Sequence, residues 1–258
     1  MNLFSLEGKV AVITGASSGL GADAARAFAE AGANVALLAR REEKLFEVAK
    51  EINEKYNKIA LTVKCDISNE DDVKNAFDTI IKEFGKVDIL LNNAGIALRG
   101  GVDDMSTEDW NKMMEVNVNG IYLACKYAVP HMKKQNYGKI INTASVNALI
   151  ADKNPPFIRH AYNASKSAVI GLTRGIAASH SQFGITCNAV GPGLFESEMT
   201  EGTLFKSDEF LTKYNFVNPV GRPAKRGELN GALLFFASDA SSYVTGQVLY
   251  VDGGITLV

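Results

Sequence analysis

Short apolar segments recur along the whole chain and are separated by longer stretches with a different pattern. Most of them are rich in Val, Ile and Leu, which is typical of strands buried on both faces of a sheet. The predicted strands are Lys9–Thr14, Asn34–Ala39, Ile59–Cys65, Val87–Asn92, Lys139–Thr143, Ile185–Val190 and Gln247–Val251.

Apolar residues at intervals of three and four occupy the stretches between these strands, which predicts helices over Gly21–Ala31, Asp71–Phe84 and Ala161–Phe183. The residues Ser68–Asp71 resemble a capping start of the second of these helices, with Asp at the place of the usual Glu. Because strand and helix alternate from end to end, we predict a parallel sheet with right-handed crossovers and helices on both faces.

The domain organisation is simple. No long Pro/Gly/Ser-rich linker, charged block or low-complexity tract divides the chain, so we expect one domain over residues 1–258. One long stretch, Leu194–Asn218, shows no clear periodicity. Loops of this length inside domains usually carry a function, and we expect a lid over a substrate site at 194–218.

Composition and charge exclude several classes of protein. Of the 258 residues, 47% are hydrophobic and 22% are charged, which is ordinary for a globular domain. With 27 Lys and Arg against 29 Asp and Glu, the net charge of −2 offers no basic excess for a nucleic-acid backbone. The isolated Cys65, Cys125 and Cys187 suit neither a disulfide framework nor a zinc cluster, and they indicate a reducing compartment.

We recognise neither a secretory signal nor a membrane-spanning segment in the sequence. Residues 1–8 lack a basic region followed by an apolar run, and the most apolar stretch, Ala232–Ala237, is far too short to span a bilayer. No His/Asp/Glu grouping has the spacing of metal ligands. We therefore expect a soluble cytoplasmic protein that uses no metal and has neither nucleic acid nor a membrane as its partner.

A glycine-rich turn, Thr14–Gly21, directly follows the first predicted strand and precedes a helix. Glycines allow the backbone to approach a ligand, and the helix N-terminus offers free N–H groups and a positive dipole end, so the turn fits a pyrophosphate. The alternative is a tight turn that only packs the helix closely. The candidate contacts are Gly15, Ser17, Ser18, Gly19, Leu20 and Gly21.

Two arginines, Arg40 and Arg41, follow the second predicted strand. An acidic residue at this place hydrogen-bonds the adenosine ribose of a dinucleotide, whereas an arginine accommodates a 2′-phosphate. We therefore predict a preference for NADP(H), with Arg40 paired to the phosphate and Arg41 stacking or assisting. The alternative is that both arginines are solvated and pair with Glu42 and Glu43.

Tyr162 and Lys166 are four residues apart in a predicted helix, so the Lys166 ammonium can reach toward the Tyr162 hydroxyl. A nearby cation stabilises tyrosinate, and an oxidised nicotinamide would add a second positive charge. Lowering the tyrosine pKa from about 10 to about 7 requires roughly 4 kcal/mol, which two cations in a desolvated pocket can supply. By itself the pair identifies little, because this spacing is common on helices.

Other short motifs occur in a characteristic order at the ends of the predicted strands. Asn92–Gly95 follows the fourth strand, Ser145 the fifth and Pro192–Gly193 the sixth; Val251–Gly254 ends the seventh, and Asn117 lies in a helix between the fourth and fifth. Together with the glycine turn and the Tyr/Lys pair, this set resembles the classical short-chain dehydrogenase/reductase family from end to end. The resemblance implies an α/β, doubly wound Rossmann fold with a seven-stranded parallel sheet, and a reversible conversion of a ketone to a secondary alcohol with NADPH as hydride source.

The resemblance also implies roles for the site residues. Tyr162 would be the general acid/base, Ser145 would hydrogen-bond the substrate oxygen, Lys166 would lower the tyrosine pKa and hold the nicotinamide ribose, and Asn117 would anchor a water of a proton relay. The structural alternatives are that Ser145 only ends a strand, that Asn117 is a helix residue with its hydrogen bonds satisfied inside the protein, and that Asp66 caps a helix. The further implied cofactor contacts are Asp66 at the adenine, Asn92 beside the ribose, Ile67, Ala94, Gly95, Pro192, Gly193 and Ser197. A homotetramer is implied as well.

Three features depart from the family pattern. Ser18 stands where many NADP-preferring members have a basic residue, which leaves the discrimination to Arg40. Ser197 replaces the usual Thr after Pro-Gly, and both hydroxyls can contact the nicotinamide carboxamide. Several extra residues, Asp152–Phe157, precede the tyrosine, border the expected site and should reshape access for the substrate.

Two substrate classes are open. Leu3–Val10 and Cys187–Gly193 are similar to gluconate 5-dehydrogenase-like members of the family, and Arg99 and Arg159 are candidate partners for a sugar-acid carboxylate. Gly193–Thr200 instead resembles 3-oxoacyl-(acyl carrier protein) reductases. We favour a sugar acid or polyol, with Ser145, Asn147, Arg99, Arg159 and Phe195 as candidate substrate contacts.

Aromatic residues in the predicted lid are the main argument for the acyl or β-keto ester class. We expect them to anchor the lid and to line part of the pocket, and we expect His160 to be a structural or substrate-pocket residue. A dinucleotide sensor without turnover is a third alternative, but such a protein tends to lose the catalytic Tyr, Lys or Ser. The aromatic residues are Phe195, Phe205, Phe210, Tyr214 and Phe216.

Overall fold

The computed structural model describes residues 2–154, 157–201 and 204–258. A seven-stranded sheet with the strand order β3-β2-β1-β4-β5-β6-β7 forms its centre, and every neighbouring pair is parallel. All predicted strands are confirmed, with small shifts of their ends. They are β1 (Val10–Thr14), β2 (Asn34–Ala39), β3 (Ala60–Lys64), β4 (Ile89–Asn92), β5 (Gly138–Thr143), β6 (Ile185–Pro192) and β7 (Val248–Val251).

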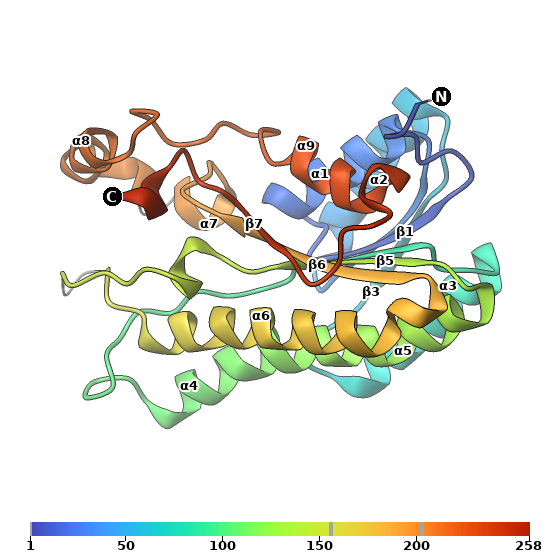
Figure 1. Ribbon diagram of the computed structural model, residues 1–258, viewed down its shortest axis with the longest axis horizontal. Coiled ribbons are helices and arrows are strands. Elements are labelled where there is room, and N and C mark those ends of the chain that lie inside the picture. Colours follow the sequence, from blue (N-terminus) through green and yellow to red (C-terminus); the bar gives the residue numbers. More distant parts are fainter. Residues whose placement is uncertain (1, 155–156, 202–203) are drawn as a thin grey trace.

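Helices cover both faces of the sheet (Figure 1). One face carries α1 (Gly19–Glu30), α2 (Glu42–Tyr56) and α9 (Asn230–Ala237). The other carries α3 (Glu70–Phe84), α4 (Thr107–Met114), α5 (Gly120–Gln135) and α6 (His160–His180). Among the helices that the structure describes, none is both long and apolar enough to cross a membrane.

The alternation of side chains along each buried strand builds two apolar layers. Ile13 of β1 packs on the face that includes Phe28 and Phe236, whereas its neighbour Val12 packs on the face that includes Phe77. Successive residues of a strand point to opposite faces, so a strand covered on both sides must be apolar throughout. This accounts for the uninterrupted apolar runs in the sequence.

The start of α3 differs in detail from the prediction. Asn69, and not Ser68, caps the helix, because the Asn69 side chain accepts a hydrogen bond from the Asp72 amide at 3.0 Å. The Ser68 hydroxyl instead donates to Asp66 at 2.7 Å. The Ser68 side chain therefore contributes to the loop before the helix and does not cap the helix.

The stretch from Leu194 to Asn218 is largely helical in its described part. It contains α7 (Glu198–Glu201), a 3₁₀ turn (Leu204–Lys206) and α8 (Asp208–Val217). Ser207 caps α8 by accepting a hydrogen bond from the Phe210 amide at 3.2 Å. No residue of α8 is fully buried, because its apolar residues at helical spacing, Phe210, Tyr214 and Val217, line the cavity and are not part of the core. The expectation of a long irregular loop is corrected accordingly.

The topology directs ligands to one edge of the sheet. β1 pairs with both β2 and β4, which makes this the point where the strand order reverses. In doubly wound sheets, ligands bind beyond the carboxyl ends of the strands at such a switch point.

Candidate active site

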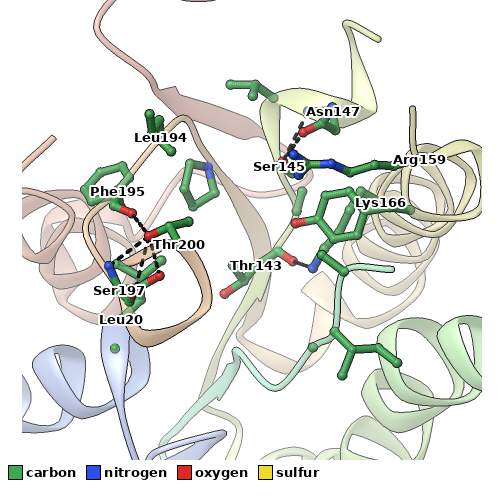
Figure 2. A pocket seen from close by; sticks show the side chains of 18 of the residues that line it. Leu20, Thr143, Ser145, Asn147, Arg159, Lys166, Leu194, Phe195, Ser197 and Thr200 are labelled. Atoms are coloured by element: carbon green, nitrogen blue, oxygen red, sulfur yellow. Dashed lines mark hydrogen bonds between the residues drawn. The ribbon is translucent and has the colours of Figure 1, made fainter. Parts of the chain in front are cut away.

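A cavity of about 1520 Å³ opens at the carboxyl ends of the strands, next to the switch point. It is larger than most small-molecule pockets and has room for a dinucleotide together with a substrate. Figure 2 shows its two sides, with Leu20 and Ser197 across from Ser145 and Lys166. The glycine turn and the predicted catalytic residues therefore share one space.

The glycine turn allows no side chain at Gly15. Its φ is +68°, and a Cβ would lie 2.8 Å from the Ala94 Cα, so that only glycine fits. Asn93 fastens the turn through hydrogen bonds from Nδ2 to the carbonyls of Thr14 (3.2 Å) and Gly15 (3.3 Å). The sequence analysis missed Asn93 and Thr14 as site residues, although Asn93 stands in the motif it quoted.

Most of the candidate cofactor contacts line the cavity, but two do not. Gly21 faces the Gly15 carbonyl inside the turn. Asn92 lies buried, where its Nδ2 donates to Asn142 Oδ1 at 2.8 Å, so the structure does not place it where a ribose contact was expected. The lining candidates are Gly15, Ser17, Ser18, Gly19, Leu20, Arg40, Arg41, Asp66, Ile67, Ala94, Gly95, Tyr162, Lys166, Pro192, Gly193 and Ser197.

The two arginines have different surroundings. Arg41 Nη2 donates to Ser18 Oγ at 2.7 Å and to Ser17 Oγ at 3.1 Å. The Arg40 side chain is 69% exposed, and its ionic contact is Asp66 at 3.9 Å. Arg41, for which the sequence suggested only an assisting role, is thus the arginine bound to the glycine turn.

Glu198 of α7 completes this charged group. Its carboxylate accepts hydrogen bonds from Arg41 Nη1 at 2.8 Å, from Arg41 Nη2 at 2.7 Å and from Lys44 Nζ at 3.1 Å. The bonds from Arg41, Ser18 and Lys44 hold the pKa of Glu198 well below its usual range. Sequence reasoning missed Glu198 and Lys44, because residues 154 positions apart meet here without any local signal.

These residues fit a dinucleotide that carries an extra phosphate. Arg41 and Lys44 already hold an anion, the Glu198 carboxylate, in the place where a phosphate would bind, and Ser17 and Ser18 accept hydrogen bonds from Arg41 there. Arg–phosphate and Arg–carboxylate pairing use the same geometry. Gly15 and Gly19 of the turn beside them line the same cavity, at the N-terminal end of α1, which suits a bound pyrophosphate.

Lys166 is buried at the opposite end of the cavity, with 4% of its surface exposed. Its Nζ donates to the Thr143 carbonyl at 2.7 Å and lies 5.6 Å from the centroid of the Tyr162 ring. Burial lowers the pKa of Lys166 to about 8. The lysine is therefore held at the end of β5, within reach of both the tyrosine and a ligand.

Tyr162 and Ser145 face each other beside this lysine. Burial raises the pKa of Tyr162 above its ordinary value, while the hydrogen bond with Ser145 and the charge of Arg159 lower it. Lys166 is not among the groups that lower the pKa of Tyr162, and its ammonium is directed at the Thr143 carbonyl. The Tyr162 hydroxyl therefore stays protonated in these surroundings.

Asn117 lies in a π-helical turn, Glu115–Asn119, between α4 and α5. Its Oδ1 accepts from the Ile96 amide at 2.8 Å, and its Nδ2 donates to the Ile96 carbonyl at 2.9 Å and to Ser165 Oγ at 3.0 Å. Such turns are often found at functional sites. The Asn117 side chain ties the loop after β4 to α6, close to Lys166.

The two candidate arginines for the substrate are placed differently. Arg159 lines the cavity, and its Nε is buried without a hydrogen-bond acceptor among the described residues. Arg99 is exposed and outside the lining, with its guanidinium carbon 5.9 Å from the centroid of the Phe157 ring. Asn147 and Phe195 line the cavity as expected. The structure therefore brings Arg159, but not Arg99, to the site.

An aromatic wall closes the substrate side. The ring of Phe210 lies 5.0 Å from that of Phe157 and 6.1 Å from that of Tyr214, and all three line the cavity. Phe216 is 91% exposed and takes no part. Of the insertion at 152–157, residues 155 and 156 lie outside the described residues. His160 Nδ1 accepts from the Val102 amide at 3.0 Å, which is a structural role.

Comparisons with known proteins agree with this geometry. A family model described as Enoyl-(Acyl carrier protein) reductase matches residues 15–256. A probable NADP-dependent mannitol dehydrogenase of Yarrowia lipolytica is 40% identical over 98% of this chain and 90% of its own. The gluconate 5-dehydrogenase of Gluconobacter oxydans is 40% identical over 99% of this chain and 98% of its own.

Solved structures extend the agreement to the whole fold. The crystal structure of a gluconate 5-dehydrogenase from Burkholderia cenocepacia J2315 in complex with NADP and tartrate superimposes with a TM-score of 0.94. It is 36% identical and covers 100% of this chain and 98% of its own. With the fold, the family model and these relatives in agreement, the chain belongs to the short-chain dehydrogenase/reductase family.

Proposed function

We propose that the protein is an NADP(H)-dependent oxidoreductase that interconverts a ketone and a secondary alcohol, with a sugar acid or polyol as its substrate. One observation carries the proposal. A single cavity has the anion-binding residues and the glycine turn at one end, and Tyr162, Ser145 and Lys166 at the other. The named relatives that use NADP support the choice of cofactor.

Each end of the cavity has its own task. Arg41, Lys44 and the glycine turn would hold the phosphates, and Lys166 would hold the nicotinamide ribose. When bound, NADPH supplies a hydride to the carbonyl carbon of the substrate. Ser145 and Tyr162 orient the carbonyl oxygen by hydrogen bonds, and Tyr162 gives its hydroxyl proton to that oxygen as negative charge develops on it.

The protonation state of Tyr162 suits the reduction of a ketone. Because burial raises the pKa of Tyr162, the hydroxyl keeps its proton at neutral pH in the ligand-free enzyme. After the transfer, tyrosinate is stabilised by the neighbouring Lys166 and is reprotonated from solvent. In the oxidative direction the same atoms act in reverse, with Tyr162 as the base.

Arg159 supports an anionic substrate. Arg159 is a half-buried arginine on the cavity wall, and its buried, unpaired Nε favours a ligand that carries a carboxylate, since an unpaired buried donor costs about 1–3 kcal/mol. A sugar acid would supply that group. A neutral polyol would use the neighbouring polar side chains Asn147 and Asn154 instead.

A 3-oxoacyl thioester or β-keto ester is the second candidate, and the aromatic wall of Phe157, Phe210 and Tyr214 favours it. A cofactor-absorbance assay separates the two. Gluconate would be offered with NADP⁺, and acetoacetyl thioester and a β-keto ester with NADPH. Turnover of gluconate supports the sugar-acid assignment, whereas turnover of only the keto compounds contradicts it.

We also propose a cytoplasmic homotetramer. The three cysteines are free and buried, as suits a reducing compartment. β7 is an edge strand with Leu249 40% exposed, and the neighbouring C-terminal Leu257 and Val258 are exposed as well. Unpaired strand edges with apolar side chains are usually covered, and a second copy of this chain would cover this one.

A further inference from the structure

The contact between α7 and the glycine turn is unlike the other ion pairs of the surface. Glu198 bridges Arg41 and Lys44, and Arg41 in turn bridges Glu198 to Ser17 and Ser18. This network joins the wall of the substrate side to the expected phosphate end of the cavity. A ligand at the phosphate end can therefore affect the substrate side through this network.

The network places a carboxylate in a site suited to a phosphate. Arg41 presents both of its terminal nitrogens to the Glu198 carboxylate, which is the bidentate geometry also used for phosphate. A 2′-phosphate and the carboxylate cannot share these donors, because like charges at such a distance repel strongly. Arg40 lies outside this network and is largely solvated.

We propose that Glu198 is a latch released by the cofactor. In the structure its carboxylate occupies the site formed by Arg41, Lys44 and Ser18, and the 2′-phosphate of NADP(H) displaces it and frees α7 from the glycine turn. The inference rests on the proposed use of NADP(H). The 2′-hydroxyl of NAD(H) carries no charge with which to displace the carboxylate, so only NADP(H) releases the latch.

Release of α7 would reshape the cavity wall. The Thr200 hydroxyl accepts from the Ser197 amide at 3.0 Å and donates to the Phe195 carbonyl at 2.7 Å, so α7 moves together with the segment at Phe195. Leu204, just beyond, also lines the cavity. Binding at the phosphate end is thereby coupled to the residues that surround the substrate.

The first test measures cofactor affinity by fluorescence titration. Glu198→Gln removes the competing charge at equal size, and we expect the Kd for NADPH to fall about five-fold, because the ion pairs are half exposed, while the Kd for NADH stays within about two-fold. Glu196→Gln is the matched control. Glu196 is exposed on the same segment and has no ionic partner among the described residues.

The second test uses adenosine 2′,5′-bisphosphate, which carries the 2′-phosphate but no nicotinamide. Hydrogen–deuterium exchange in residues 196–201 should rise when it binds to the wild type, whereas 5′-AMP should leave it unchanged. In Glu198→Gln the exchange should already be high without ligand. If NADPH binds tightly to the wild type but Glu198→Gln behaves like Glu196→Gln, the latch is overturned and the proposed cofactor is not. If NADPH does not bind to the wild type at all, the proposed cofactor is overturned as well.

Discussion

Arg159 is the side chain that separates a sugar acid from a neutral substrate. Its Nε is buried on the cavity wall without an acceptor among the described residues. We predict that Arg159→Gln raises the KM for a sugar acid about 10- to 100-fold, the usual range for a lost hydrogen bond to a charged group, and changes that for a neutral polyol little. Steady-state kinetics with both substrates measure this split. Arg99→Gln, at an exposed position outside the cavity, is the control; if it has the larger effect, the assignment to Arg159 is wrong.

Lys166 gives the stability of the protein a pH dependence. Its folded-state pKa of about 8 lies below the ordinary 10.5, so the unfolded chain binds more protons between these values. The free energy of unfolding must therefore rise as pH increases from about 8 to 10.5, by about 3 kcal/mol from this group. Denaturant titrations of wild type and Lys166→Met at both ends of the range compare the two slopes. If the unfolding free energies of the two proteins depend equally on pH, burial does not lower the pKa of Lys166.

Single residues also show how far sequence reasoning reaches. Tyr162, Lys166 and Ser145 were predictable because short spacings and strand ends position them. Arg41 was given the lesser role, because its partner Glu198 comes from a segment 157 residues away. The Asn92 side chain turns into the sheet and Asn93 toward the glycine turn, which the motif alone does not tell.

The glycine turn is the local element on which cofactor binding depends. Gly15 has φ +68° and would place a Cβ 2.8 Å from Ala94, whereas Gly8 has φ +72° with open space around it. Both Gly→Ala variants should lose about 1 kcal/mol of unfolding free energy, since the left-handed conformation is unfavourable for alanine. Only Gly15→Ala should lose further stability and at least ten-fold in NADPH affinity.

Chemical denaturation and a fluorescence titration measure the two effects. An unchanged NADPH affinity in Gly15→Ala would show that cofactor binding does not depend on the close packing of the turn against Ala94. Gly8→Ala serves as the control for the backbone conformation alone.

Strands and core helices follow from periodicity because burial imposes it, and the strands and the helices α1, α3 and α6 were predicted in this way. α8 was missed, although Phe210, Tyr214 and Val217 have helical spacing and Ser207 followed by Asp208 and Glu209 is a recognisable helix start. The π turn at Glu115–Asn119 has no sequence pattern of its own. Elements that serve the cavity rather than the core are thus the ones that the pattern does not reveal.

For the molecule as a whole, the exposed apolar edge predicts assembly. Light scattering should give four times the chain mass of 27.7 kDa. Leu249→Arg on the edge strand β7 should reduce the assembly, because it places a charge on the surface that a second copy would cover.

Phe46→Arg is the matched control, since Phe46 is 55% exposed on α2, away from β7. A monomer at micromolar concentration, or the same loss of mass in both variants, would count against the proposed arrangement.

The central claim is that Tyr162 transfers the proton in a ketone–alcohol conversion that uses NADP(H). Tyr162→Phe keeps the ring and removes only the hydroxyl, so NADPH affinity should stay within about two-fold while kcat falls by about 10²- to 10⁴-fold. The direct measurement is turnover of a verified substrate by this variant, together with its NADPH Kd. A large loss of kcat with cofactor binding intact is the predicted result, and turnover at the wild-type rate would contradict the mechanism.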